Sequence, residues 1–123
     1  MFLVTIRMAN NASFKKVFTL VDKDNNPVSL AGAPLRCWIK KNAGDSQHLE
    51  LSTTNGYLSV DSVNTNKLTM NIPANALGPT KQIVRGVEVD NPYVFDLLQI
   101  NSATDRPLIL KGTISVDRGV THG

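Results

Sequence analysis

The chain has little of what most enzymes use for chemistry. Its 123 residues include one cysteine and two histidines, and the eight glycines are scattered singly. No paired histidine or cysteine spacing typical of a metal site occurs, and no glycine-rich phosphate loop. His48 and His122 are far apart, and His122 stands next to the last residue, so a nucleophile–histidine pair is not indicated. These absences predict a protein that is not an enzyme and that needs no metal and no cofactor.

The acidic residues do not form a recognisable site either. Asp22, Asp24 and Asn26 alternate as in a calcium loop, but Pro27 and Ala33 stand where an EF-hand needs glycine and glutamate. The segment therefore predicts a turn. The other carboxylates, such as Glu50, Glu88 and Asp96, are isolated in the sequence, so no glycosidase pair is indicated.

Long apolar runs and charge clusters are also missing. No segment approaches the roughly 20 apolar residues that cross a bilayer, and the opening MFLVTIR does not resemble a signal peptide. The net charge is +3, but the 13 basic residues are spread from Arg7 to Arg118. Nucleic-acid-binding proteins concentrate such charge on one stripe. We therefore expect neither membrane insertion nor a nucleic-acid partner, and we expect the single Cys37 to be a small buried residue.

What the chain has in abundance is two-residue alternation. Leu68, Met70 and Ile72 alternate with polar residues, and so do Leu58 and Val60. This period is typical of strands with one face on a core and one in water. Asn55-Gly56, just before the run that contains Leu58 and Val60, predicts a tight hairpin turn.

Further strands are expected along the rest of the chain. Segment 14–21 ends at a turn cluster, and 93–100 is apolar on both faces, which indicates a central, covered strand. The last expected strand lies in segment 107–116 and has two different faces. One face carries Ile109, and the other carries Leu108, Leu110, Gly112, Ile114 and Val116. We expect one helical turn at 73–77 and a long loop at 78–92 with a short strand at 83–89.

These patterns predict an all-β fold, an immunoglobulin-like antiparallel β-sandwich of about 7–9 short strands. The length favours a single domain over 1–123. Residues 1–13 are expected to form an N-terminal strand or arm, and 117–123 a polar C-terminal tail.

One surface feature follows from the strand expected at 35–41. If Leu35, Cys37 and Ile39 face the core, then Arg36, Trp38 and Lys40 share the opposite face. An aromatic ring between two cations is suited to stacking on a sugar, a base or a partner's side chain. The alternative, which we favour at this point, shifts the register by one and places Trp38 in the core, as in strand C of many immunoglobulin-like sandwiches.

The order of these segments resembles a family. The chain runs through FTLVDKDNNPVSLAGAPLRCWIKK, LELSTTNGYLSVD, NKLTMNIPANAL, YVFDLLQI and LILKGTISV. Over residues 14–120 this order resembles small immunoglobulin-like structural proteins of tailed phages, encoded among tail and fibre genes. The chain departs from that pattern at Asn26, at Phe95 and in the insert 78–92.

The resemblance implies a structural component of a phage virion, in the tail, baseplate or fibre-attachment region. It would be located in the virion, and in the host cytoplasm during assembly. Its partners would be other virion proteins and further copies of itself, with a trimer favoured, and the apolar second face including Ile109 would be presented to a neighbouring subunit. The alternative is a carbohydrate-binding or capsid-surface decoration module of a phage that binds a host-surface glycan.

Overall fold

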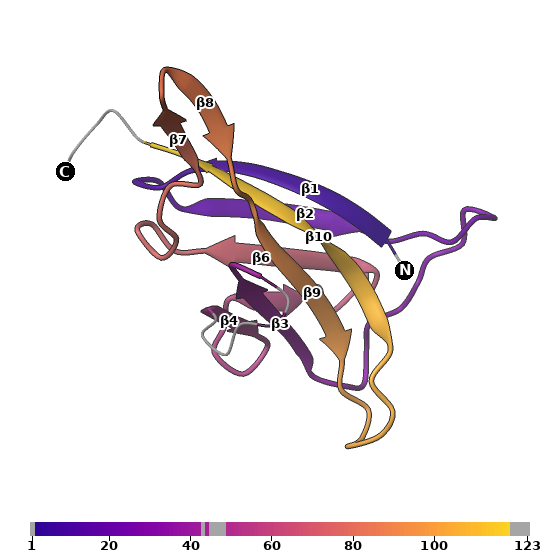
Figure 1. The fold of residues 1–123 in the computed structure, drawn as a ribbon. Coiled ribbons are helices and arrows are strands. Elements are labelled where there is room, and N and C mark those ends of the chain that lie inside the picture. The colour runs from indigo at the N-terminus through magenta and orange to yellow at the C-terminus, as the bar shows by residue number, and fades with distance from the viewer. Residues whose placement is uncertain (1, 43, 45–48, 119–123) are drawn as a thin grey trace.

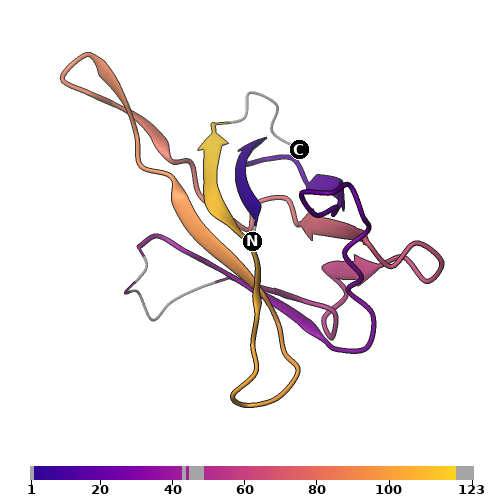
Figure 2. The same ribbon diagram turned by 90° about the vertical axis from the view of Figure 1, so that its right-hand side faces the viewer.

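Two β-sheets packed face to face make up most of the molecule (Figures 1 and 2). The computed structural model describes residues 2–42, 44 and 49–118. Ten strands are found there: β1 Phe2–Ala9, β2 Phe14–Thr19, β3 Leu35–Lys40, β4 Leu49–Ser52, β5 Leu58–Val60, β6 Lys67–Ile72, β7 Lys81–Val84, β8 Val87–Asp90, β9 Tyr93–Gln99 and β10 Leu108–Asp117. One sheet has the order β1-β10-β9-β3-β4, the second has the order β2-β6-β5, and β7 and β8 form a separate hairpin.

The expected all-β, immunoglobulin-like sandwich is confirmed. The order β10-β9-β3-β4 corresponds to strands G, F, C and C′ of a variable-type immunoglobulin domain, and β2-β6-β5 to strands B, E and D. The strand count slightly exceeds the expected number because the β7–β8 hairpin adds two strands outside the two layers. No helix occurs among the described residues, and therefore none that could cross a membrane.

The alternation of side chains creates the core. Each sheet turns one face toward the other, and the apolar residues expected on those faces are buried there. On β3 these are Leu35, Cys37 and Ile39, and on β6 they are Leu68, Met70 and Ile72. Cys37 behaves as a small apolar residue, because burial raises the pKa of its thiol well above the ordinary value.

The pairing of β1 adds a parallel pair to a sandwich whose other described strand pairs are antiparallel. β1 runs parallel to β10, with Phe2 opposite Leu110 and Ala9 opposite Asp117. A parallel pair needs a long crossover between its two strands, and here almost the whole chain separates them. Local sequence patterns cannot reveal a partner so distant along the chain.

The alternation expected in the last strand is interrupted at Ile109. Leu108 pairs with Leu98 and Leu110 with Leu97, so Ile109 is an extra residue in a β-bulge. Ile109 is half-buried and packs against the core cluster. The bulge reverses the faces on either side of it, so Leu108 lines the outer surface of the sheet. The expectation that Ile109 stands opposite the apolar face is therefore wrong.

Three local expectations also need correction. Residues 73–77 form turns with no helix, and Asn75 has a positive φ of 64°. Asn55-Gly56 does not join two paired strands, because β4 and β5 belong to different sheets. The segment expected to hold one strand at 83–89 is the β7–β8 hairpin, with Arg85 and Gly86 at its turn.

The expected turn at Asp22 is present, since its carboxylate accepts hydrogen bonds from the backbone N–H of Asp24 and of Asn26.

Gly112 allows β1 to approach β10, and this contact makes a first prediction. A Cβ atom added at Gly112 would lie 1.6 Å from the carbonyl oxygen of Val4, so Gly112→Ala must push β1 away from the sheet. We expect this substitution to lower the free energy of unfolding by about 3 kcal/mol or more, measured by urea denaturation.

The matched control is Gly78→Ala. A Cβ atom there would meet only the Tyr93 hydroxyl, at an ordinary contact distance of 3.7 Å. We expect a change within about 0.5 kcal/mol. Equal effects of the two substitutions would contradict the close approach of β1 as the cause.

Candidate interaction surface

No strand or helix of the described residues covers the outer face of the five-stranded sheet (Figure 2). In the register of the strands, one residue from each strand forms a row across this face. In the order of the sheet, the row consists of Leu3, Lys111, Asp96, Trp38 and Glu50. The strand expected to be covered on both faces, β9, is therefore covered on its inner face only.

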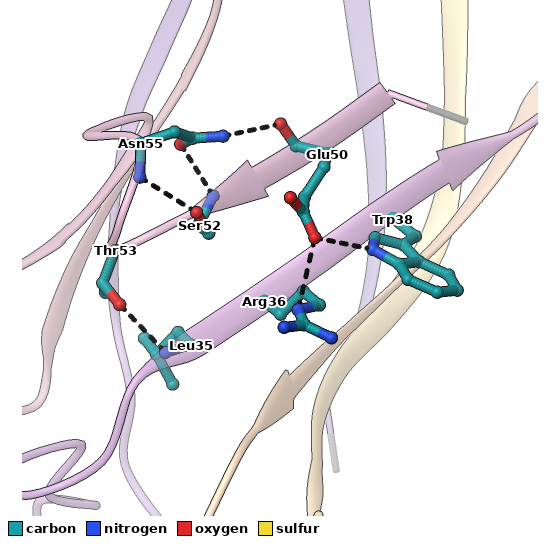
Figure 3. A network of polar contacts seen from close by, with 7 residues as sticks. All are labelled: Leu35, Arg36, Trp38, Glu50, Ser52, Thr53 and Asn55. Carbon is teal, nitrogen blue, oxygen red and sulfur yellow. Dashed lines mark hydrogen bonds and ion pairs between the residues drawn. The ribbon is translucent and has the colours of Figure 1, made fainter. Parts of the chain in front are cut away.

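Trp38 lies on this outer face, and not in the core as we had favoured. Its side chain is 36% exposed, and its Nε1–H donates a hydrogen bond of 3.0 Å to Oε1 of Glu50 (Figure 3). The Arg36 guanidinium lies 3.2 Å from the same oxygen. Lys40 Nζ stands 5.1 Å from the centre of the indole ring, within the range of a cation–π contact. The structure therefore places Arg36, Trp38 and Lys40 on one face, as in the register that we did not favour, and Glu50 joins them.

A polar network holds the edge strand β4 in place beside this cluster (Figure 3). The Asn55 side chain accepts a hydrogen bond from Ser52 N–H and donates one to the carbonyl oxygen of Glu50. Thr53 Oγ1 accepts a hydrogen bond from Leu35 N–H. These contacts fix the backbone of Glu50, and so help to position the carboxylate that binds Trp38 and Arg36.

A groove of about 570 Å³ lies on this face. Trp38 and Lys40 form one side, and residues of β1 and β10 form the other. The apolar part of its lining comes chiefly from Leu3, Val94 and Leu108, and the charged part from Lys40, Asp96 and Lys111. Leu3 is 73% exposed, so the groove is an open apolar surface with charges of both signs.

The β7–β8 hairpin is a second exposed apolar surface. It projects beyond the end of the two sheets in both views (Figures 1 and 2). Ile83 is 70% exposed and Val87 63%, and Val84 and Val89 are also exposed. Because soluble proteins bury most large apolar side chains, a strand pair with four exposed ones is typical of an interaction site.

A network of hydrogen bonds fixes the base of the hairpin to β10. The Asp90 carboxylate accepts hydrogen bonds from Thr80 Oγ1 at 2.7 Å and from Ser115 Oγ at 2.6 Å. Thr80 Oγ1 in turn accepts one from Val116 N–H at 2.8 Å. The two hydroxyl groups lower the pKa of Asp90. We call Thr80, Asp90 and Ser115 the hairpin clamp.

An ion pair supports the clamp from the next position along the chain. Lys81 Nζ lies 2.8 Å from Oδ1 of Asp117. The hydrogen bond to Asp117 and its negative charge raise the pKa of Lys81. The hairpin thus leaves the sandwich in a defined direction.

Sequence reasoning located part of this surface only. It identified Arg36, Trp38 and Lys40 as one group, but it missed Glu50, Asp96 and the hairpin. Alternation along the strand at 93–100 places Asp96 outward, but only the register puts it between Lys111 and Trp38. Ile109, the fourth expected contact residue, does not join the group.

His48 and His122 lie outside the described residues. Within the described residues no group of three or more potential metal ligands occurs.

No protein-family model matches the chain, and no curated protein matches it with significant similarity.

The hairpin clamp predicts a pH dependence. The pKa of Asp90 is lowered from its ordinary value of 3.8, so its stabilising contribution is complete above about pH 4 and is lost as the pH falls through the lowered pKa. Protonation removes one acceptor oxygen from Thr80 or Ser115. As the pH is lowered, we expect the amide resonances of residues 81–90 to shift at a higher pH than the core resonances do. A pH titration monitored by ¹H–¹⁵N NMR measures these shifts.

Asp90→Asn should produce the same hairpin shifts at neutral pH. Asp105→Asn serves as the control, because Asp105 lies in a different loop and contacts only its own turn. Hairpin and core resonances that shift together in acid would show that the clamp does not titrate independently.

Proposed function

We propose that this protein is a non-enzymatic structural component of a tailed-phage virion, assembled in the tail, baseplate or fibre-attachment region. The motif order over residues 14–120 supports the phage assignment. One structural observation supports assembly in particular: the exposed apolar side chains are concentrated in two places. Of eight large exposed apolar side chains among the described residues, two line the groove and four belong to the hairpin.

Assembly with further copies of the chain would also protect the sheet edges. β1 and β4 are the edge strands of the five-stranded sheet, and β1 is eight residues long with a single charged residue, Arg7. Long apolar edges promote unwanted strand pairing unless a neighbour covers them. A closed homo-oligomer, with a trimer favoured by analogy with phage tail parts, would cover edges and apolar surfaces together.

A glycan-binding role at Trp38 is the second candidate. Exposed tryptophan is the side chain that stacks best on a sugar ring, and polar groups surround it here. A stacking platform is usually extended by further aromatic side chains, and the two tyrosines of the chain are Tyr57 and Tyr93. Both instead pack against the core cluster, so neither extends the surface around Trp38. The geometry therefore supports assembly more than glycan binding.

Particle composition tests the proposed function. We expect mass spectrometry of purified, nuclease-treated virions to detect the chain at a constant ratio to the tail proteins. Virions dissociated into heads and tails provide the control, because the chain should follow the tail fraction. Absence from particles made by cells that express the chain would contradict the proposal.

The glycan candidate has its own measurement. If Trp38 stacks on a sugar, binding to host cell-surface glycans should occur in an array and should fall by about tenfold or more in Trp38→Ala. Because Trp38 lies outside the core, this variant should remain folded. We expect no such binding for the wild-type chain, and Trp38-dependent capture of one glycan class would favour the second candidate.

A further inference from the structure

The groove and the hairpin are two exposed surfaces that one chain leaves uncovered. The groove lies on the outer face of the five-stranded sheet, and the hairpin extends away from the end of that sheet (Figures 1 and 2). The hairpin clamp and the Lys81–Asp117 ion pair hold the hairpin in that direction. The hairpin of a chain therefore does not cover its own groove, but that of a second copy can reach it.

The turn of the hairpin contains an unusual residue. Arg85 has a φ of 51° and Gly86 a φ of 78°, as the two central residues of a tight type I′ turn require. Asparagine and glycine adopt this conformation most readily. The other two described residues besides glycine with positive φ are both asparagines, Asn25 and Asn75. An arginine at such a position is a backbone outlier, and outliers of this kind concentrate at functional positions.

The charges at the tip and in the groove are complementary. The tip carries Arg85 and Glu88, and the groove carries Asp96 and Lys111, which are directly opposite each other on β9 and β10. Within the described part of the chain, none of these four side chains makes a hydrogen bond or an ion pair with another residue. Each is thus available to a partner of opposite charge.

We propose that the tip of the β7–β8 hairpin of one copy inserts end-on into the outer-face groove of a second copy. Arg85 pairs with Asp96, and Glu88 lies beside Lys111. The apolar tip residues Val84 and Val87 contact the apolar lining of the groove, which comes from Leu3, Val94 and Leu108. The proposal rests on the assembly role and names the partner surface for it.

This contact is heterologous, because two different surfaces of the chain meet. Each copy then donates one hairpin and accepts another, and such contacts close into rings when the rotation between copies allows it. A trimer with three identical contacts is one such ring. A two-fold dimer would instead bring the same surface of each copy together.

Charge reversal provides the decisive test. Sedimentation velocity of the full chain should show a multimer at micromolar to tens of micromolar concentration. Asp96→Arg and Arg85→Glu should each weaken the association by about tenfold or more, because each places like charges in contact. The double variant, with both charges reversed, should return to within about threefold of the wild type.

An equimolar mixture of the two single variants distinguishes the heterologous contact from others. Each variant alone places like charges together, but in the mixture the hairpin of either variant can enter an oppositely charged groove of the other. This satisfies two of the three contacts of a trimer, and every contact of an even-numbered ring or an open chain. The mixture should therefore associate more tightly than either separate variant.

Two further variants separate folding from association. Arg85→Asn suits the positive φ of the turn better than arginine, so the hairpin should persist by NMR while association weakens about tenfold. Val63→Ser removes an exposed apolar side chain that is outside both surfaces, so it should leave association unchanged.

The outcomes that overturn the proposal are specific. A monomeric wild-type chain at tens of micromolar, or single variants that associate as the wild type does, would exclude the contact. So would a double variant that stays dissociated while folded. If the chain is present in virions but its association does not depend on Arg85, the hairpin contact fails and the structural role stands. If the charge-dependent association is found but the chain is absent from virions, the structural role fails and the contact stands.

Discussion

The packing of two unequal sheets on a single core is the constraint on which the other features depend. The core takes one face of each sheet, and every second residue of β3, β9 and β10 must therefore point away from it. The smaller sheet can cover only one side of the larger one. Trp38, Asp96 and Lys111 lie outside because their neighbours along the chain must be inside. The outer surface is thus a direct consequence of core packing.

How much of this could be predicted from the sequence depends on the range of the interaction concerned. The strands, their inward residues and the sandwich follow from alternation, which is a local property. The position of Trp38 also follows from alternation, because Leu35, Cys37 and Ile39 already occupy the inner face; the preference for a core tryptophan came from analogy with other immunoglobulin-like domains and was wrong. Local patterns alone were the more reliable guide here.

The features that could not be predicted depend on contacts between distant segments or on small irregularities. The parallel pairing of β1 with β10 joins the two ends of the described chain. The bulge at Ile109 inserts one residue that sequence alternation does not mark, and it exchanges the faces of Leu108 and Ile109. The role of Glu50 requires the register between β3 and β4, since the carboxylate is placed by pairing with Trp38. In each case the sequence does not reveal which residues of neighbouring strands lie opposite each other.

Strand β10 connects the two surfaces of the molecule. Its first half contributes Leu108 and Lys111 to the groove, and its last residues hold the hairpin through Ser115, Val116 and Asp117. A hydrogen-bonded strand in the middle of a packed sheet is among the more rigid parts of a protein. The angle between groove and hairpin is therefore set by the fold. In a heterologous assembly that angle decides whether copies close into a ring or continue as a chain.

The backbone conformation of Arg85 has a cost in stability. A residue with a Cβ atom in the left-handed region costs about 1–2 kcal/mol relative to its usual conformation, and asparagine lowers that cost by local hydrogen bonding. At Asn25 and Asn75 the chain has the residue that suits the backbone, but at the hairpin tip it does not. The tip residues are exposed, so packing within the described part of the chain does little to compensate for the arginine. A compensating interaction outside the chain is the simplest physical reason for the guanidinium there, and Asp96, the one acidic residue among the described residues that line the groove, is a partner of the required charge.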